Sequence, residues 1–421
     1  MTPVLFTTIF VAFLMATTLL RLTLARRQFR HVSAHRGAVP AEFSAAIPIE
    51  AHQKAADYTV ARVRLGMIDL IVGALYVLIL TLGGVLQALH EFWQGWFAVG
   101  GYAHGIAFIA SIGVLGFAIE LPFGIYRTFI IEERFGFNKM NWRLYVADII
   151  KEALLTAVIG VPVLLAVLWL MNSMGERWWL YVWLFWLVFN LLVLLIYPTF
   201  IAPLFNKFSP LSDESLAQRI EALLGRCGFR SSGLYVMDGS RRSAHGNAYF
   251  TGFGSAKRIV FFDTLLGRLQ AEEIEAVIAH ELGHYKLHHI WKRLALMALG
   301  SLAFLWLLGY LIDQPWFYQG LGVTSSGTAV ALVLFSLVIP VFAFPLAPVT
   351  SALSRRHEFE ADAYAAGHTR AADLISALVK LYRENAATLT PDPVYSTFYD
   401  SHPPAAVRIA RLRTCQEAPC T

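Results

Sequence analysis

Two histidines spaced four residues apart mark the part of the sequence best suited to chemistry. The stretch reads His280-Glu281-Leu282-Gly283-His284, and residues four apart lie on the same face of a helix. His280 and His284 can therefore present two imidazoles to one metal ion, with Glu281 beside its open coordination position. Zinc is held in this way, and such a glutamate can take a proton from the water that the metal activates. The competing interpretation is an exposed polar turn of helix, because so short a pattern also arises by chance.

A third metal ligand must come from elsewhere in the chain, because a catalytic zinc takes three protein ligands and a water. Candidates follow in residues 354–362, Ser-Arg-Arg-His-Glu-Phe-Glu-Ala-Asp. Glu358 and Asp362 are four apart, so one helix face offers a ligand and an acceptor that could orient a histidine. Spacing alone leaves Glu360 open as the ligand, and it also allows the run to be a solvated acidic helix. His288 is a further candidate ligand, although an interfacial role is more common for such a residue.

The composition indicates that the elements holding these residues lie in a membrane. The 421 residues are 57% hydrophobic and only 15% charged, whereas soluble domains carry about a quarter charged residues. The net charge is +5, but the basic residues cluster beside apolar segments, so nucleic acid is not an expected partner. Seven segments have the roughly 20 apolar residues that cross a bilayer. They are Pro3–Leu20, Met67–Leu89, Ala103–Ile125, Ala153–Met171, Trp178–Phe200, Leu294–Ile312 and Thr328–Val349.

The distribution of Lys and Arg among the loops predicts the orientation in the membrane. Nearly all of them fall on one side of the predicted spans, and Arg177 is the only basic residue in the loops of the other side. We therefore expect the N-terminus outside and the C-terminus in the cytoplasm. Both large polar regions then share the cytoplasmic face, so the two halves of a metal site can meet there.

The same pattern divides the chain into four parts. They are five spans in 1–200, a catalytic region in 201–293, two spans in 294–350 and a C-terminal catalytic region in 351–421. Short β-rich runs predict a small sheet in the first catalytic region, at Leu234–Met237, Ala248–Phe253 and Arg258–Phe262. A helical pattern begins at Ala271 and continues without a proline to the sixth span. The predicted fold is a mainly α-helical multi-pass membrane protein with seven transmembrane helices and a small α/β metallopeptidase region.

The sequence resembles a known family, the type I CAAX prenyl proteases, which are integral-membrane zinc metallopeptidases of the gluzincin class. The resemblance rests on both metal motifs and extends over most of the chain. Four further stretches carry it, namely Glu132–Lys139, Pro203–Phe208, Asn247–Phe250 and Ser401–Pro404. It implies seven helices that enclose a water-filled chamber. It also implies one zinc ion per chain and hydrolysis of peptide bonds near the C-terminus of CAAX-type (prenylated) or similar peptides.

The resemblance further implies a zinc ion on His280, His284 and Glu358. Glu281 would be the general base and proton shuttle. Asp362 would orient one of the histidine ligands through its other ring nitrogen.

Residues outside the two motifs receive roles from the same resemblance. His402 would stabilise the oxyanion of the tetrahedral intermediate, and Arg408 would support His402 or the substrate. Asn247 and Ala248 would pair with an extended peptide by strand addition. By residue type alone, His402 before two prolines is more often a turn residue, and Asn247 could begin an ordinary strand. Glu120, within a predicted span, is expected to line the chamber; for Asp69 that role and a snorkelling one are equally open.

Other classes of protein fit the sequence less well. Membrane-protein quality-control proteases of the heat-induced type are the main alternative, but they typically have four spans. Intramembrane site-two proteases carry their histidines inside an apolar span, and a transporter would need neither motif. We expect a monomer whose partners are a peptide substrate and the lipid bilayer. The C-terminal sequence lacks a lysine-rich retrieval tail, which favours a bacterial inner membrane over the endoplasmic reticulum.

Overall fold

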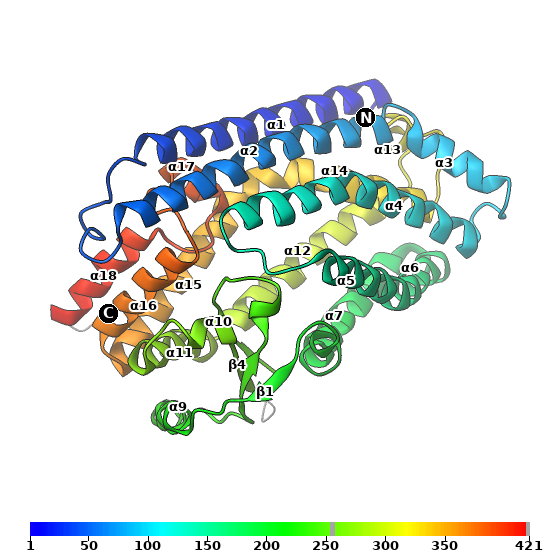
Figure 1. Ribbon diagram of the computed structural model, residues 1–421. Coiled ribbons are helices and arrows are strands. Elements are labelled where there is room, and N and C mark those ends of the chain that lie inside the picture. Colours follow the sequence, from blue (N-terminus) through cyan, green and yellow to red (C-terminus); the bar gives the residue numbers. More distant parts are fainter. Residues whose placement is uncertain (253–256, 418–421) are drawn as a thin grey trace.

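The computed structural model describes residues 1–252 and 257–417, and this part of the chain is mainly helical (Figure 1). Within it, seven helical segments are long and apolar enough to cross a membrane. The first two are α1 (Pro3–Ala34) and α2 (Ile49–Leu80), and the third is α4 (Tyr102–Tyr126) continued by η1 (Arg127–Glu132). The fourth consists of α5 (Trp142–Leu155), η2 (Thr156–Gly160) and α6 (Val161–Ser173). The fifth consists of η3 (Gly175–Arg177), α7 (Trp178–Ile196), η4 (Tyr197–Ile201) and α8 (Ala202–Phe205). The last two contain α12 (His289–Leu311), and α14 (Thr328–Ala343) with η7 (Phe344–Leu346) and α15 (Ala347–His368). The prediction of seven spans is confirmed.

The second span ends earlier in the structure than the predicted boundary at Leu89. Helix α2 stops at Leu80, and the short helix α3 (Val85–Gln94) follows after a turn. Gly84 in this turn has φ +78°, a conformation that glycine adopts without the steric cost of a side chain. Hydropathy alone could not show this break, because the apolar character continues across the turn. On the same side of the spans, α13 (Pro315–Gln319) connects α12 to α14.

A small mixed sheet follows the fifth span. Its strands are β1 (Phe208–Pro210), β2 (Leu234–Met237), β3 (Ala248–Thr251) and β4 (Arg258–Phe262), in the order β1-β2-β4-β3. Strands β2 and β4 are parallel, and β3 pairs antiparallel with β4, with Ala248 opposite Phe261. The three predicted runs are strands, while β1 is too short to give a signal of its own. The predicted strand end at Phe253 lies outside the described residues.

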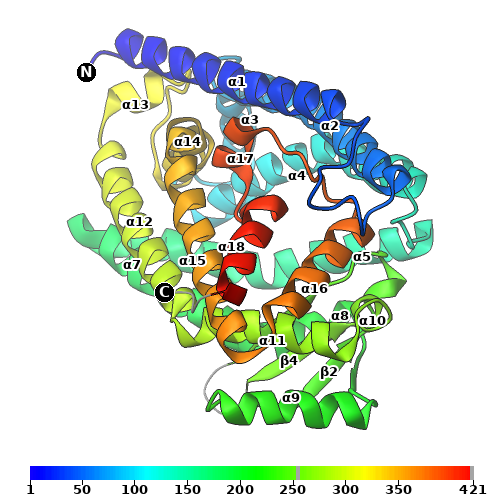
Figure 2. The same cartoon turned by 90° about the vertical axis from the view of Figure 1, so that its left-hand side faces the viewer.

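Helix α11 (Ala271–Lys286) carries the histidine motif and is held from several sides. Its apolar face, with Ile274, Ile278 and Leu282, is buried in the core that it shares with the sheet and neighbouring helices. The remaining elements of this region are η5 (Gly239–Arg241), α9 (Glu214–Arg226), α10 (Asp263–Leu266), α16 (Ala371–Glu384), α17 (Pro393–Tyr399) and α18 (Ala405–Glu417). Figure 2 shows α11, α15, α16 and α18 gathered at one end of the molecule, next to α9 and the sheet.

Ion pairs attach α11 to the helices on both sides. Glu275 of α11 pairs with Arg219 of α9 at 2.6 Å. Glu273 pairs with Lys380 of α16 at 2.7 Å, accepts a hydrogen bond from Ser376 of the same helix, and also belongs to the capping box at the start of α11. Both glutamates are buried, so these pairs restrict rotation of α11 about its own axis.

The helix does not continue into the sixth span as the sequence pattern predicted. It ends at Lys286, and α12 begins at His289. His288 between them has φ +58°, the left-handed conformation that a residue with a side chain rarely adopts. The turn sends the chain in a new direction and places His289 beside the metal motif.

The two motif helices approach each other closely at Gly283. Helix α15 crosses α11 there, and a Cβ atom built on Gly283 would lie 3.0 Å from Ala361 Cα and 3.0 Å from Tyr364 Cβ. Backbone atoms of a helix cannot move individually, so a side chain at this position would push α15 away. Glycine at the centre of the motif thus sets the distance between the two helices.

Replacing Gly283 by alanine should therefore destabilise the protein by about 1–3 kcal/mol, the usual cost of overpacking a core. Gly225→Ala is the matched control, because a Cβ there meets no atom within 4 Å and alanine is the better helix former. Thermal unfolding of the purified variants in detergent measures both effects. A Gly283→Ala variant as stable as the Gly225→Ala variant would contradict this account of the helix contact.

Candidate metal centre and active site

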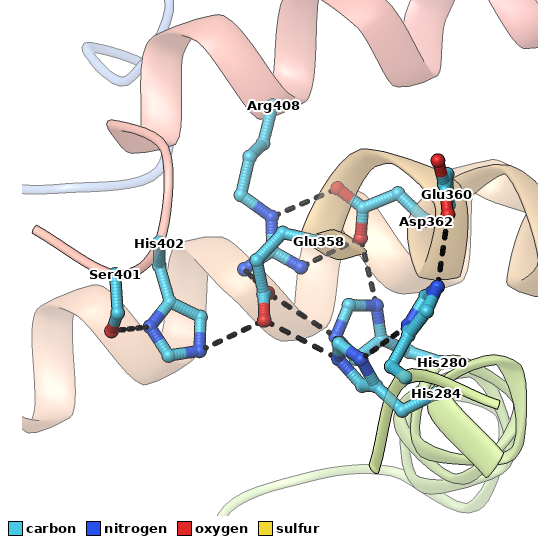
Figure 3. Close-up of polar contacts among 9 residues, drawn as sticks. His280, His284, Glu358, Glu360, Asp362, Ser401, His402 and Arg408 are labelled. Carbon is cyan, nitrogen blue, oxygen red and sulfur yellow. Dashed lines mark hydrogen bonds and ion pairs between the residues drawn. The ribbon is translucent and has the colours of Figure 1, made fainter. Parts of the chain in front are cut away.

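Helices α11 and α15 bring the three predicted metal ligands together, although they lie far apart in the sequence (Figure 3). His280 Nε2 and His284 Nε2 are 3.2 Å apart. Glu358 Oε2 lies 3.4 Å from His280 Nε2, and its Oε1 lies 3.3 Å from His284 Nε2. Three ligand atoms from two helices thus converge on one point.

This arrangement fits a zinc ion. Ligand atoms 2.0–2.2 Å from a tetrahedral zinc are separated from one another by about 3.3–3.6 Å, close to the distances observed. Glu358 is buried, and its Oε2 accepts no hydrogen bond within the described part of the chain. A buried carboxylate oxygen without a partner is costly, and a cation between the three ligands would remove that cost.

Asp362 lies behind His280, on the side away from the ligand cluster. Its Oδ1 is 2.9 Å from His280 Nδ1, the nitrogen that does not face Glu358. Burial disfavours the charged imidazole, but the neighbouring carboxylates of Asp362 and Glu358 outweigh it and raise the pKa of His280 to about 9. The acidic surroundings of this ring therefore favour a bound cation.

Arg408 of α18 completes the buried side of the cluster. Its guanidinium donates two hydrogen bonds to Asp362, from Nε at 2.9 Å and from Nη2 at 2.6 Å. Nη1 lies 3.6 Å from Glu358 Oε2. The side chain is 6% exposed, so Arg408 reaches both carboxylates from inside the protein. Its predicted support of His402 or the substrate stays a prediction.

His402 lies on the opposite, open side of the cluster, in the segment between α17 and α18. Its Nε2 is 3.3 Å from Glu358 Oε1, and its Nδ1 is 3.0 Å from Ser401 Oγ. The side chain is 60% exposed. Even so, the protein atoms around the ring displace water and lower the pKa of His402, which favours the neutral ring with one N–H donor. The structure thus places a hydrogen-bond donor at the mouth of the site.

The two remaining glutamates of the motifs differ in their surroundings. Glu281 is partly exposed, and within the described residues no hydrogen bond or ion pair holds its carboxylate. Glu360, which spacing left open as a ligand, lies away from His280 and bonds instead to His289, at 2.9 Å. His288, the candidate named from the sequence, is exposed, whereas His289 is buried. It is therefore His289 that reaches the site.

His289 contacts the metal motif although its position in the sequence did not mark it as a candidate. Its Nδ1 is 3.0 Å from His284 Nδ1, yet five residues separate the two, which on a continuous helix would place them on different faces. Only the left-handed turn at His288 brings them together. No periodicity in the sequence could signal this contact.

Asn247 and Ala248 lie at the start of β3, the edge strand of the sheet. The Asn247 side chain accepts a hydrogen bond from the Ala248 N–H at 2.8 Å, and its carbonyl accepts one from Phe262 at 2.9 Å. Strand β4 pairs with one side of β3, and no strand of the described residues pairs with the other. Helix α11 also packs against β3.

A cavity of about 860 Å³ lies among the spans and is lined by Glu120 together with Asp148, Glu152 and Arg242. Asp148 forms a two-point ion pair with Arg242, at 2.8 and 2.9 Å. Glu120 is exposed in the structure and lines this cavity, and its expected place on a water-filled chamber stays a prediction. Asp69 is partly exposed on α2, and its role stays open.

Comparison with known proteins matches both halves of the chain. Residues 28–207 match the CAAX prenyl protease N-terminal domain of five membrane helices, and residues 210–416 match peptidase family M48. The CAAX prenyl protease 1 homolog of Arabidopsis thaliana is 39% identical over 316 residues, which are 73% of each chain. That of Caenorhabditis elegans is 33% identical over 419 residues, 92% of this chain and 93% of its own. The crystal structure of S. mikatae Ste24p matches with a TM-score of 0.91 at 30% identity, covering 97% of this chain and 99% of the other.

The buried Asp362–Arg408 pair generates a test of the site's architecture. Replacing Asp362 by alanine leaves the Arg408 guanidinium buried without its main partner, which should cost about 3–5 kcal/mol of stability. The exposed pair of Arg36 and Asp57, at 2.7 Å, is the control, and Asp57→Ala should cost about 0–1 kcal/mol. Thermal unfolding of the metal-free proteins in detergent compares the two. Equal losses of stability in the two variants would show that the Asp362–Arg408 pair is not desolvated.

Proposed function

The chain belongs to peptidase family M48 and carries the N-terminal membrane domain of the CAAX prenyl proteases, and on this basis we propose that it is a membrane-embedded zinc endopeptidase. It hydrolyses peptide bonds near the C-terminus of CAAX-type peptides. The observation that carries the proposal is the convergence of His280, His284 and Glu358 within 3.2–3.4 Å of one another. Glu281, whose carboxylate has no partner in the described chain, belongs to the same motif.

His280, His284 and Glu358 would hold the ion in this proposal. When bound, zinc supplies a Lewis acid that activates water and polarises a carbonyl. The buried Oε2 of Glu358, which has no hydrogen-bond partner in the described chain, and the Asp362 carboxylate beside His280 support this assignment.

The chain's own residues then handle the protons and the charge. Glu281 accepts a proton from the attacking water and returns it to the leaving amine, as a general base and then a general acid. His402 donates a hydrogen bond to the oxyanion, whose negative charge develops in the transition state. Arg408 sits behind the carboxylates and keeps Asp362 and Glu358 in place by its hydrogen bonds and charge.

The substrate backbone would pair with the free edge of β3 at Asn247 and Ala248. Strand addition holds a peptide by its main chain, so it suits peptides of variable sequence. The relatives in Arabidopsis thaliana and Caenorhabditis elegans are CAAX prenyl protease 1 homologues, which supports CAAX-type peptides as the substrate class.

The topology proposed from the Lys and Arg distribution keeps the site on the cytoplasmic side, with the N-terminus outside. The chain would act as a monomer, with the four-part division at residues 200, 293 and 350 separating spans from catalytic regions. A bacterial inner membrane rather than the endoplasmic reticulum stays a prediction.

Replacing Glu281 by glutamine should lower proteolysis by about 10²–10⁴-fold, the usual contribution of a general base, while the zinc content stays at one per chain. Glu272→Gln on the same helix is the control, because Glu272 is partly exposed in the first turn and pairs with Arg219, away from the ligand cluster. Peptide cleavage and metal analysis of the same preparations give both readouts. Full proteolysis by a zinc-loaded Glu281→Gln variant would reject the mechanism.

The lipid requirement is tested by mass spectrometry of peptides cleaved by the purified full chain. Matched CAAX peptides with and without a farnesyl group on the cysteine are supplied at equal concentration. We expect a higher kcat/KM for the farnesylated peptide, because the site lies at a membrane-spanning helix where an isoprenoid chain loses contact with water. Equal cleavage of both peptides would instead assign the chain as a general membrane endopeptidase, including the quality-control type.

A further inference from the structure

The ring of His284 has a second set of contacts on the side away from Glu358. Its Nδ1 lies 3.0 Å from His289 Nδ1. His289 Nε2 in turn lies 2.9 Å from Glu360 Oε2. Figure 3 shows this chain of side chains running from the ligand cluster to Glu360 on α15.

The members of this chain are held firmly. His289 is 4% exposed and is the first residue of α12, directly after the left-handed turn. The ring of His357 stacks on it, with centroids 4.1 Å apart and planes 12° from parallel. Glu360 is oriented by a hydrogen bond from Arg356 at 2.9 Å.

Counting protons on the rings assigns the direction of each hydrogen bond. A neutral imidazole carries one proton, and the nitrogen that binds a metal must offer a lone pair. If His284 Nε2 faces the metal, the proton of this ring is on Nδ1, and His284 donates to His289 Nδ1. His289 then carries its own proton on Nε2 and donates it to Glu360. A single set of tautomers satisfies both contacts.

We propose that Glu360 and His289 form a hydrogen-bond relay that positions His284 as a metal ligand. This inference rests on the proposed metal site. The relay serves His284 as Asp362 serves His280, so each imidazole is oriented from behind by a carboxylate, directly in one case and through a second imidazole in the other. His289 and Glu360 are positioning residues, because neither reaches the reacting atoms.

A different use of the same residues is a second metal site, since ligand atoms of His289, His357 and Glu360 lie within 4.8 Å of one another. A metal on His289 Nε2 would move the proton of that ring to Nδ1. Two N–H groups would then face each other across 3.0 Å whenever His284 Nε2 bound its own metal. The proton count therefore favours the relay over a second ion.

The affinity of the full chain for Zn²⁺, measured by competition with a chelator, tests the relay. His289→Leu removes both hydrogen bonds and should weaken Zn²⁺ binding by about 10–100-fold, the range found for partners of metal ligands. His289→Gln should recover most of this loss, because its amide oxygen can accept from His284 while its NH₂ group donates to Glu360. A role in packing alone would not separate glutamine from leucine in this direction.

His357→Phe is the matched control, because phenylalanine keeps the stacking on His289 but cannot bind a metal. The relay predicts one Zn²⁺ per chain and unchanged affinity for this variant, whereas loss of a second Zn²⁺ would overturn the relay in favour of two ions. The visible spectrum of the Co²⁺-substituted protein gives an independent readout, and it should change for His289→Leu and not for His357→Phe.

Three results distinguish a failure of the relay from a failure of the proposed zinc-dependent function. A wild-type chain that binds no Zn²⁺ would defeat the proposed function itself. Tight binding by the wild type with equal affinity in His289→Leu would defeat the relay alone. If His289→Leu does not fold, Glu360→Leu takes its place, since it removes the end of the relay from a partly exposed position, and unchanged affinity there would have the same meaning.

Discussion

Three short side chains can share one ion only if the helices that carry them lie nearly in contact. Imidazole and carboxylate groups extend a few ångströms from the backbone, so α11 and α15 have to approach until their main chains touch, and Gly283 permits that approach at Ala361. Ion pairs of Glu273 and Glu275 on other faces of α11 then prevent the helix from turning. The capping box, the charged neighbours and the absence of a side chain at Gly283 together fix the distance between α11 and α15.

The charges around the cluster set its electrostatic character. Glu358 and Asp362 bring two buried carboxylates, while Arg408 contacts both and brings one guanidinium. Without Arg408 the two acids would repel each other in a poorly solvated space. With it, the group keeps an excess negative charge, which attracts a divalent cation without neutralising it completely. Such a residual positive charge is what a metal needs to polarise water or a carbonyl.

The sequence predicted the features that depend on local spacing. His280 and His284 share a face because both lie within one helix, and the seven spans follow from runs of apolar residues. Spacing could not choose between Glu358 and Glu360, because the answer depends on how α15 crosses α11; the family resemblance selected Glu358. The partnership of His289 with His284 could not be predicted, since it depends on one residue in a left-handed conformation. The early end of α2 was not predicted for a similar reason, because the glycine turn interrupts a run of residues that is still apolar.

The seventh span has a mechanical consequence. Residues 328–368 form one nearly continuous helical segment, whose first half lies among the spans and whose second half carries Glu358. At about 1.5 Å per residue, the carboxylate lies some 13–14 Å beyond the predicted end of the span at Val349. Helices adjust their tilt to the thickness of the bilayer, and over such a lever a change of about 5° moves the far end by roughly 1 Å. One nearly continuous helical segment therefore joins the lipid-spanning part of the chain to the ligand cluster.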